Sequence, residues 1–486
     1  MVTRIDKYKR KPMGIYHIYH WLDRFSTKSL VITSILVLMA MVSVSIDGVN
    51  GQARVALFSF LSAMIFWVGV NIPAGFVAIT LIIFIILTGT GSQELLYQSL
   101  SEEVVWLMIG SFIIGEAVKQ TGLAERFSRS ILAFAVNKNS VLLGVTAVLF
   151  ATAFFIPSTS GRAALAMPVM KQLNEKFTER EQKVLSILAP VIILMSTSAT
   201  VIGAGSHIIG IGLLESTTGQ SISYSQWLVW GAPFAVIVTL FSLLIIKWVL
   251  WPKEALKEWK EKPSQTVDQP NRTMNRKEKQ MLILLTFLMV GWMTEHVHGY
   301  DIAFITIIGA VLVMVPNYGI MNWKQGMKAV SWNLIVFVAA ATALGKVLVD
   351  TGVINWMKGH MLQVLGLVTD TPEWLIVVIV LLFTVTSHVY ITSHTTRAIV
   401  WIPALLIFSE TINVNPSAVV FLSLIGMNYC VTFPVSSKAL LLFYEEGEVS
   451  YEAKDLLKLS VILMPLYVFT AVCFYFTYWK WTGMHL

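Results

Sequence analysis

The stretch Pro157-Ser158-Thr159-Ser160-Gly161-Arg162-Ala163-Ala164-Leu165-Ala166-Met167-Pro168 lies within apolar sequence, yet it holds three hydroxyls, a glycine and an arginine in succession. A polar, broken backbone at membrane depth is tolerated only where protein buries it or where it lines a water-filled cavity, because lipid offers its amides no partner. The stretch therefore predicts a functional site.

A second stretch has the same pattern 235 residues later. It reads Thr392-Ser393-His394-Thr395-Thr396-Arg397-Ala398-Ile399-Val400-Trp401-Ile402-Pro403. Each copy has a Ser, a hydroxyl two residues after it, Arg-Ala at four and five residues, and Pro at ten. A repeated pattern of this kind is harder to explain as chance than a single one.

The composition sets the class of fold. The 486-residue chain is 56% hydrophobic and 13% charged, whereas soluble domains carry roughly a quarter charged residues. We therefore predict an all-α, multi-pass protein of the plasma membrane. The net charge of +7 comes from Lys and Arg clustered in a few loops. In membrane proteins such clusters mark the cytoplasmic loops and set the orientation of the chain. Nucleic-acid binding is therefore not expected. Cys430 and Cys473 lie in apolar runs, which excludes a disulfide framework or thiolate metal site and indicates no function for either.

Charge also predicts the topology of the first half. Residues 1–28 form a basic amphipathic segment expected to lie on the cytoplasmic membrane face, which places the amino terminus inside. The first transmembrane half is predicted at 29–250. Loops 90–103 and 215–226 contain no Lys or Arg, as external loops should. Counting both halves, we expect about eleven spanning helices of roughly 17 to 25 residues each.

The opening stretch lies inside a segment that basic residues flank on both sides. Lys138 precedes the segment 140–170 and Lys171 follows it. If both basic loops face the cytoplasm, the segment must enter and leave by one face. We therefore predict a re-entrant hairpin at about 140–170, with Ser158–Gly161 at its tip.

The rest of the first half contains a helix break and ends at a linker. The polar, Gly-containing segment 196–207 interrupts an apolar run and predicts a broken helix. Residues 251–279 are rich in Lys, Arg, Glu, Gln, Pro and Asn and are predicted to form a cytoplasmic linker between the two halves.

The second transmembrane half, predicted at 280–486, repeats the first. Residues 101–122 align without gaps on 331–352, an offset of 230, close to the offset of 235 between the two tips. A shared order at a near-constant offset indicates duplication. Because each copy has an odd number of crossings, we expect inverted repeats, with a second hairpin at about 375–405 that enters from outside.

The tips have the chemistry of an anion site. Amides left unpaired at a helix start, together with the positive end of the helix dipole, bind anions, and hydroxyls add neutral hydrogen bonds. Arg162 and Arg397 each lie four residues after the tip Ser, within reach of it along a helix. The residues expected to bind substrate are Ser158, Thr159, Ser160, Arg162, Ser393, His394, Thr395 and Arg397.

Less specific interpretations of the same residues remain open. Polar residues inside spans often join helices or bond to their own backbone, and His207 or His394 could be a buried core donor. A membrane Arg can pair with a carboxylate or extend to the interface. The duplication of whole tips favours a site over these interpretations.

With these motifs, the chain resembles the divalent anion/sodium symporter family of the ion transporter superfamily, which carries di- and tricarboxylates or sulfate. The resemblance covers nearly the whole chain after the first span. Ser158-Thr159-Ser160 and Ser393-His394-Thr395 match the family's Ser-Asn-Thr tips, and Trp106, Gly115, Thr121-Gly122 and Ser223-Tyr224-x-Gln226-Trp227 match other landmarks. The resemblance implies an elevator-type homodimer, with substrate between the tips and sodium between each tip and the neighbouring helix break.

The departures from the family pattern concern the coupling ion. Neither tip has the Asn, and Ala204-Gly205-Ser206-His207 and Ser437-Lys438-Ala439-Leu440 stand where the family has Thr-Pro-Pro-Asn-like breaks. No cofactor is expected; sodium is the candidate coupling ion, with candidate ligands at Ser158, Gly203 and Ser393. The residues expected to couple the ion, or to substitute for it, are Thr200, Gly203, His207, Ser436, Ser437 and Lys438. Since the Lys438 ammonium could take the electrostatic role of a sodium ion, we expect sodium coupling to be weakened or absent.

The sequence thus predicts a secondary active transporter for a small divalent anion, most simply a di- or tricarboxylate, working as a symporter or an exchanger. A sulfate or other oxyanion carrier, or a cation/proton antiporter of the same superfamily, remains an alternative. A membrane enzyme or receptor is disfavoured, because no nucleophile is paired with a general base.

Overall fold

The computed structural model describes residues 27–46, 48–69, 72–123, 126, 137–156, 158–174, 177–252, 273–356, 372–445 and 450–486. Most of the predicted amino-terminal segment 1–28 lies outside these ranges. So do Pro157 of the first tip and most of the linker predicted at 251–279. Within the described ranges every regular element is helical, as the composition predicts.

The first half of the chain consists of helices, one of which is interrupted by two 3-10 turns. They are α2 (Thr27–Ser45), α3 (Gly51–Gly69), α4 (Ala74–Leu87), α5 (Glu94–Ser99), α6 (Glu103–Thr121), α8 (Lys138–Ala151), η1 (Thr152–Phe154), α9 (Thr159–Asn174), α10 (Glu179–Met195), η2 (Ser196–Ala199), η3 (Val201–Gly203), α11 (Gly205–Thr218) and α12 (Tyr224–Val249).

The second half begins inside the predicted linker, because α13 already starts at Arg276. Its elements are α13 (Arg276–Met293), α14 (Glu295–His298), α15 (Ile302–Val313), α16 (Trp323–Ala329), α17 (Trp332–Asp350), α19 (Glu373–Thr386), η5 (Ser387–Val389), α20 (His394–Thr411), α21 (Pro416–Asn428), η6 (Pro434–Ser436), α22 (Lys438–Glu445), α23 (Ala453–Phe474) and the π-helix η7 (Tyr475–Trp479).

The same order of elements occurs in both halves. A long helix (α6, α17) is followed by two helices joined through a short 3-10 turn and a tip (α8-η1-α9, α19-η5-α20). A helix that ends in 3-10 turns and resumes comes next (α10 to α11, α21 to α22), and a long helix closes each series (α12, α23). The two predicted hairpins therefore correspond to α8–α9 and α19–α20.

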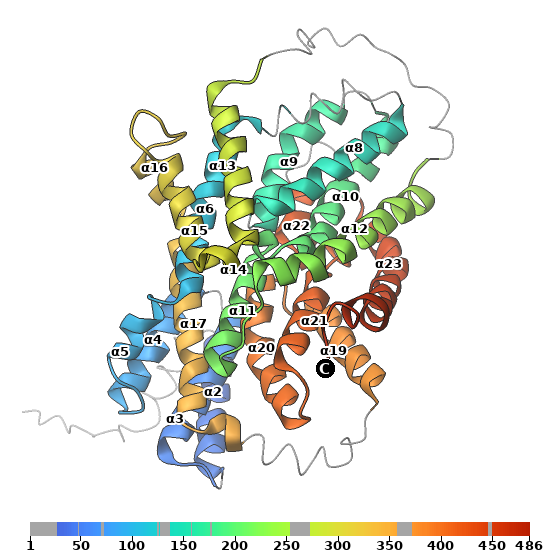
Figure 1. Ribbon diagram of the computed structural model, residues 1–486. Helices are drawn as coiled ribbons and strands as arrows, with labels where there is room; N and C mark the ends of the chain where they lie inside the picture. Colours follow the sequence, from blue (N-terminus) through green and yellow to red (C-terminus); the bar gives the residue numbers. More distant parts are fainter. Residues whose placement is uncertain are drawn as a thin grey trace, which may run out of the picture.

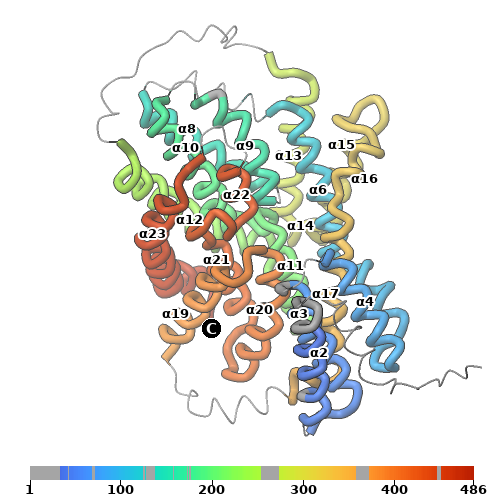
Figure 2. The backbone as a smooth tube through the Cα atoms, turned by 180° about the vertical axis from the view of Figure 1, so that it is seen from behind, coloured from blue at the N-terminus to red at the C-terminus, as the bar shows by residue number. Residues whose placement is uncertain are grey.

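The helices gather into two bodies that lie side by side (Figure 1, Figure 2). One body contains α2 to α6 and α13 to α17, where α6 packs on α15 and α4 packs on α17. The other contains α8 to α12 and α19 to α23, where α11 packs on α20 and α19 packs on α21. Helix α11 also contacts α6 and α17, so it lies at the boundary between the bodies.

The outer surface is apolar, as lipid contact requires. Four helices are long and apolar enough to cross a membrane by length and composition, namely Glu179–Ala199, Tyr224–Val249, Trp332–Asp350 and Ala453–Trp479. Large apolar side chains point outward from two of them: Trp248 is 76% exposed, Val461 68% and Phe469 65%. Such exposure is a liability in water and is ordinary against lipid.

Candidate functional site

The two tips meet at a cavity of about 300 Å³ that we call the central cavity. Its lining includes six of the eight residues predicted to bind substrate, which are Ser158, Thr159, Ser160, Ser393, His394 and Thr395. These residues are 235 positions apart in sequence, so the fold brings the two copies of the pattern together. Figure 1 shows why, because α8–α9 and α19–α20 extend in opposite directions from the middle of one body.

Each tip Ser caps the helix that follows it. The Gly161 amide donates to Ser158 Oγ at 3.2 Å, and the Thr396 amide donates to Ser393 Oγ at 3.2 Å. Capping satisfies one of the free amides at a helix start and leaves the others available. The starts of α9 and α20 therefore face one cavity with unpaired amides and with the positive ends of their dipoles.

The central cavity has a positive, carboxylate-free lining. Lys438 lines it from the first residue of α22, and within the described ranges its ammonium forms no ion pair. The other polar groups come from hydroxyls, amides and the His394 imidazole. A surface of this composition favours a small anion over a cation.

Arg162 lies behind the first tip and does not line the central cavity. Its side chain is 0% exposed. Nε donates to Thr152 Oγ1 at 2.9 Å and Nη2 donates to the Leu149 carbonyl at 3.0 Å. Further bonds reach the hydroxyls of Ser196 and Thr197, so four oxygens from the hairpin and the helix break surround one guanidinium.

Arg397 lies behind the second tip in the corresponding position. It is also 0% exposed, but its contacts are fewer. Nη1 is 3.5 Å from the Tyr429 carbonyl oxygen, and Nε and Nη2 have no hydrogen-bond partner within the described residues. The two arginines are therefore alike in position and different in how far their donors are satisfied.

These positions differ from the predicted ones, in which both guanidinium groups face the substrate. The i to i+4 relation puts each Arg within reach of its tip Ser, but a side chain one turn into a helix points back along the turn before it. Here that direction leads away from the cavity, toward Thr152 for Arg162 and toward Tyr429 for Arg397.

The first helix break is held together by backbone and side-chain contacts. Thr200 Oγ1 donates to the Ala153 carbonyl of η1 at 2.8 Å. Gly203 lies so close to the chain before it that a Cβ at this position would be 2.2 Å from the Thr197 carbonyl oxygen. Of the predicted coupling residues in this break, Thr200 and Gly203 thus fix the backbone next to the first tip.

A bridge joins this break to the second half. His207 places Nδ1 3.0 Å from the Thr200 carbonyl and Nε2 2.9 Å from Asn428 Oδ1. The Asn428 amide donates to Ser198 Oγ at 2.9 Å. All of these side chains are buried, so one amide links the ends of α10 and α21.

The second break contains Ser436, Ser437 and Lys438. Ser436 Oγ accepts from the Phe433 amide and Ser437 Oγ accepts from the Ala439 amide, both at 3.2 Å. The two serines therefore cap the turns on either side of the break, and only Lys438 of the three lines the central cavity.

Several residues of the site were not predicted. Ser111, Ser331 and Asn333 line the central cavity from the other body, and Asn428 supplies the bridge described above. In the sequence, Asn428 stands out only as a single side-chain amide at the end of the apolar run 416–428. Ser111 and Ser331 resemble many other serines in spanning helices, so nothing in the sequence marks them.

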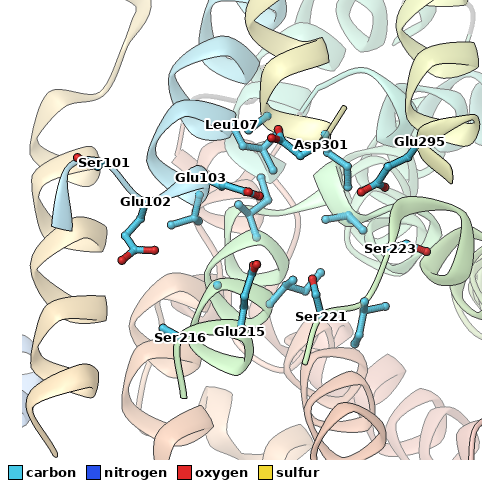
Figure 3. A pocket seen from close by; sticks show the side chains of 18 of the residues that line it. Ser101, Glu102, Glu103, Leu107, Glu215, Ser216, Ser221, Ser223, Glu295 and Asp301 are labelled. Atoms are coloured by element: carbon cyan, nitrogen blue, oxygen red, sulfur yellow. The ribbon is translucent and has the colours of Figure 1, made fainter. Parts of the chain in front are cut away.

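A second, larger cavity of about 470 Å³ adjoins the central one, and we call it the acidic vestibule. Ile208 lines both cavities. Figure 3 shows carboxylates of Glu103, Glu215 and Asp301 directed toward the same space. Burial, then the negative charges of Asp301 and Glu215, raise the pKa of Glu103 to about 7.

An all-helical fold with apolar outer helices, and with two helix starts facing one polar cavity, defines a secondary membrane transporter. Residues 24–485 match the family described as the sodium:sulfate symporter transmembrane region. The chain belongs to this family, and it is a transport protein rather than an enzyme.

Relatives with assigned names agree with this class. A sodium-dependent dicarboxylate transporter, SdcS, of Staphylococcus saprophyticus is 22% identical, with 90% of each chain covered. A citrate/succinate antiporter of Escherichia coli is 24% identical over 76% of this chain and 77% of its own. A protein of Cupriavidus necator described as a membrane protein is 23% identical over 79% of this chain and 76% of its own.

A solved structure has the same overall fold. The Alcanivorax borkumensis YdaH transporter superposes with a TM-score of 0.55 at 11% sequence identity, covering 80% of this chain and 88% of that chain. At this identity the likeness concerns the fold alone.

Proposed function

We propose that this transporter moves a small dicarboxylate or tricarboxylate, which binds in the central cavity between the two tips. The observation that carries the proposal is the lining of that cavity, where two capped helix starts and Lys438 face one space without a carboxylate. A carboxylate at either end of a short dianion would find unpaired amides at one tip and at the other. The named relatives carry dicarboxylates or citrate and succinate, which supports the same substrate class.

The two bodies suggest how transport occurs. Both tips and both breaks belong to one body, and the other body contributes only part of the cavity lining. A body that holds the whole binding site can carry substrate by sliding against its partner. We infer an elevator mechanism, built on inverted repeats and operating in a homodimer whose amino termini face the cytoplasm.

The family resemblance implies a sodium position between each tip and the neighbouring helix break. In this chain the position at the first tip is the less well supported of the two. The oxygens between the first tip and the first break are the kind that sodium takes as ligands, but four of them already bind the Arg162 guanidinium. A fixed cation among these oxygens leaves no electrostatic need for a mobile one. We infer that sodium is not required at this position, and the relatives include both a sodium-dependent carrier and an antiporter.

Counterflow of labelled succinate in proteoliposomes tests the substrate class. Vesicles loaded with unlabelled succinate should take up label faster than vesicles loaded with buffer, and citrate or malate should compete. Sulfate serves as the competing oxyanion. Competition by sulfate alone would assign the cavity to an oxyanion instead.

Repeating counterflow with sodium replaced by choline tests the coupling ion. We expect uptake to persist without sodium. A strict requirement for sodium would contradict the role inferred for Arg162 and leave the substrate assignment intact.

A further inference from the structure

Another cavity lies between the first hairpin and the other body, and we call it the apolar cavity. Its volume is about 220 Å³. Its walls come from α8 and α9 of the hairpin, with Val148 and Ala166, and from α6 and α13 of the other body, with Val118 and Leu285. The boundary between the two bodies therefore contains an apolar space as well as the acidic vestibule.

The polar side chains of the apolar cavity are already bonded to protein. Among the described residues that line it, Thr152 and Arg162 are the polar ones. Arg162 Nε donates to Thr152 Oγ1 at 2.9 Å. The other two guanidinium nitrogens donate to the Leu149 carbonyl and to the hydroxyls of Ser196 and Thr197. Because a buried water needs two or more polar partners, the cavity suits an apolar ligand better than water.

The second half of the chain shows which side chains the apolar cavity lacks. At the offset of 235 between the tips, Ala166 corresponds to Trp401 and Val148 corresponds to Phe383. The Trp401 ring packs against Phe383 with 4.6 Å between the ring centroids, and against Tyr390 with 6.2 Å. The counterparts of all three aromatic residues line the apolar cavity. Two side chains that fill the second hairpin are therefore replaced by smaller ones in the first.

The apolar cavity opens on a face of α8 that suits contact with lipid. Leu143 is 55% exposed, and Ala147 and Ala151 are exposed as well. Residues four apart lie on one face of a helix, so these three form an apolar stripe. Ala147 and Ala151 also line the cavity. A molecule that enters along this stripe comes from the hydrocarbon region of the bilayer.

We propose that the apolar cavity binds the end of one acyl chain of a membrane lipid, which enters past Ala147 and Ala151. Apolar cavities in proteins stay dry, and one of roughly 150 Å³ takes up benzene or xenon. Lipid tails are as apolar as the lining, so the gain comes from dispersion contacts that the walls of an empty cavity lack. The headgroup stays outside the cavity, which therefore recognises the alkyl chain alone.

The bound acyl chain contacts both bodies at once. Val148 and Ala166 of the cavity wall belong to the hairpin, and Leu282 and Leu285 belong to α13. A ligand favours the arrangement to which it binds more tightly. The chain therefore stabilises the arrangement of the bodies seen in this structure, and it must leave before they slide. This consequence for transport rests on the function proposed above, whereas the binding of lipid does not.

Photo-crosslinking in proteoliposomes tests the binding of lipid. The probe is phosphatidylcholine with a diazirine near the end of one acyl chain, and mass spectrometry locates the adducts. We expect adducts on Val169 and Leu285, which line the cavity and are 6% and 4% exposed, as well as on Leu143 of the outer stripe. Ala166→Trp introduces the side chain of the second half. It should abolish the adducts on the two buried residues and leave those on Leu143.

The matched control places the same side chain outside the apolar cavity. Leu143 lies on α8 but does not line the cavity, so Leu143→Trp should keep the adducts on Val169 and Leu285. Parent protein labelled at Leu143 alone would overturn the proposal, and so would unchanged labelling of the two buried residues in Ala166→Trp. Should Ala166→Trp elute as aggregate in size-exclusion chromatography, Val148→Phe provides the same comparison, because it also copies the second half.

Counterflow of succinate tests the consequence for transport. An indole fixed between the hairpin and α13 cannot leave as a lipid chain can, so Ala166→Trp should slow counterflow by about tenfold, equal to roughly 1.4 kcal/mol. Leu143→Trp should keep the parent rate, and equal rates in the two variants would overturn the restraint on sliding. If the parent protein shows no counterflow, the proposed function fails, and the adducts still decide whether the cavity binds lipid.

Discussion

At the scale of single residues, buried charge is the feature that distinguishes this site. Arg162 and Arg397 follow the two tips at the same spacing and are both fully buried. Burial of a guanidinium is costly unless acceptors surround it. Arg162 has four oxygen acceptors, and Arg397 has one long contact to a carbonyl, so the two halves cannot have identical roles.

Arg162→Ala should convert the carrier toward sodium dependence. Removing the guanidinium frees Thr152 Oγ1, Ser196 Oγ and other oxygens that suit a small cation. We expect counterflow in sodium-free buffer to fall by about tenfold, equal to roughly 1.4 kcal/mol, and sodium to restore part of it. The exposed Arg180 provides the control, since Arg180→Ala should change neither rate. Full sodium-free activity in the Arg162 variant would contradict the assignment.

Asn428→Leu should destabilise the fold through the bridge between halves. The substitution leaves His207 Nε2 and Ser198 Oγ without their partner in a buried site, at a cost of about 1–3 kcal/mol. The midpoint of thermal unfolding in mild detergent should fall. Ser423→Ala is the matched control, because Ser423 is equally buried in α21 but bonds only to its own helix, at the Val419 carbonyl. An equal decrease for both variants would argue against the bridge.

At the scale of elements, the helix breaks position the tips. The break between α10 and α11 consists of two 3-10 turns that bring Gly203 against the Thr197 carbonyl. On the hairpin side, η1 meets the same break through the bond from Thr200 to the Ala153 carbonyl. Displacement of this backbone would move the first tip and the oxygens that hold Arg162.

Gly203→Ala should impair transport far more than Gly51→Ala, a control in α3 outside the cavity lining. A Cβ at 203 would be 2.2 Å from a backbone oxygen, whereas one at 51 has no heavy atom within 4 Å. Overpacking of this kind costs about 1–3 kcal/mol, and here the strain falls on the site. We expect about a tenfold or greater decrease in counterflow for Gly203→Ala and near-normal rates for Gly51→Ala. Similar rates in the two variants would show that the break tolerates a shift.

At the scale of the whole molecule, the boundary between the two bodies contains the acidic vestibule. Carboxylates from α6, α11, α14 and the start of α15 meet there beside the central cavity. Burial, then Asp301, also raises the pKa of Glu295. Because these groups are partly accessible to water, the vestibule changes its charge within the ordinary range of pH.

Glu103→Gln should flatten the pH dependence of stability. The pKa of Glu103 in the fold is about 7, above its ordinary value of 4.5, so the protonated form is favoured by folding. Its stabilising contribution is complete below pH 4.5 and is lost as pH rises through 7. We expect the unfolding midpoint of the parent to decrease between pH 5 and pH 8, and the variant to show a smaller decrease. Glu94→Gln, on α5 away from the vestibule lining, should behave like the parent.

Patterns among residues close in sequence were enough to predict the fold class and the position of the two tips. Apolar runs gave the helical membrane fold, and the repeated Ser-x-hydroxyl-x-Arg-Ala pattern located both tips and six residues that meet at the central cavity. These features depend on residues close in sequence, where helix starts, caps and hydrophobic periodicity are set. Lys438 was predicted from the family resemblance instead, because it stands where the family has its second helix break.

Contacts between distant segments were decided only by the tertiary structure. The orientation of Arg162 and Arg397 away from the cavity, the bridge through Asn428, and the approach of Cys430 to His394 each join segments whose relative placement no local pattern contains. The sequence determined where the chain must be polar and broken, and packing of the two halves determined which of those polar groups face the substrate and which face each other.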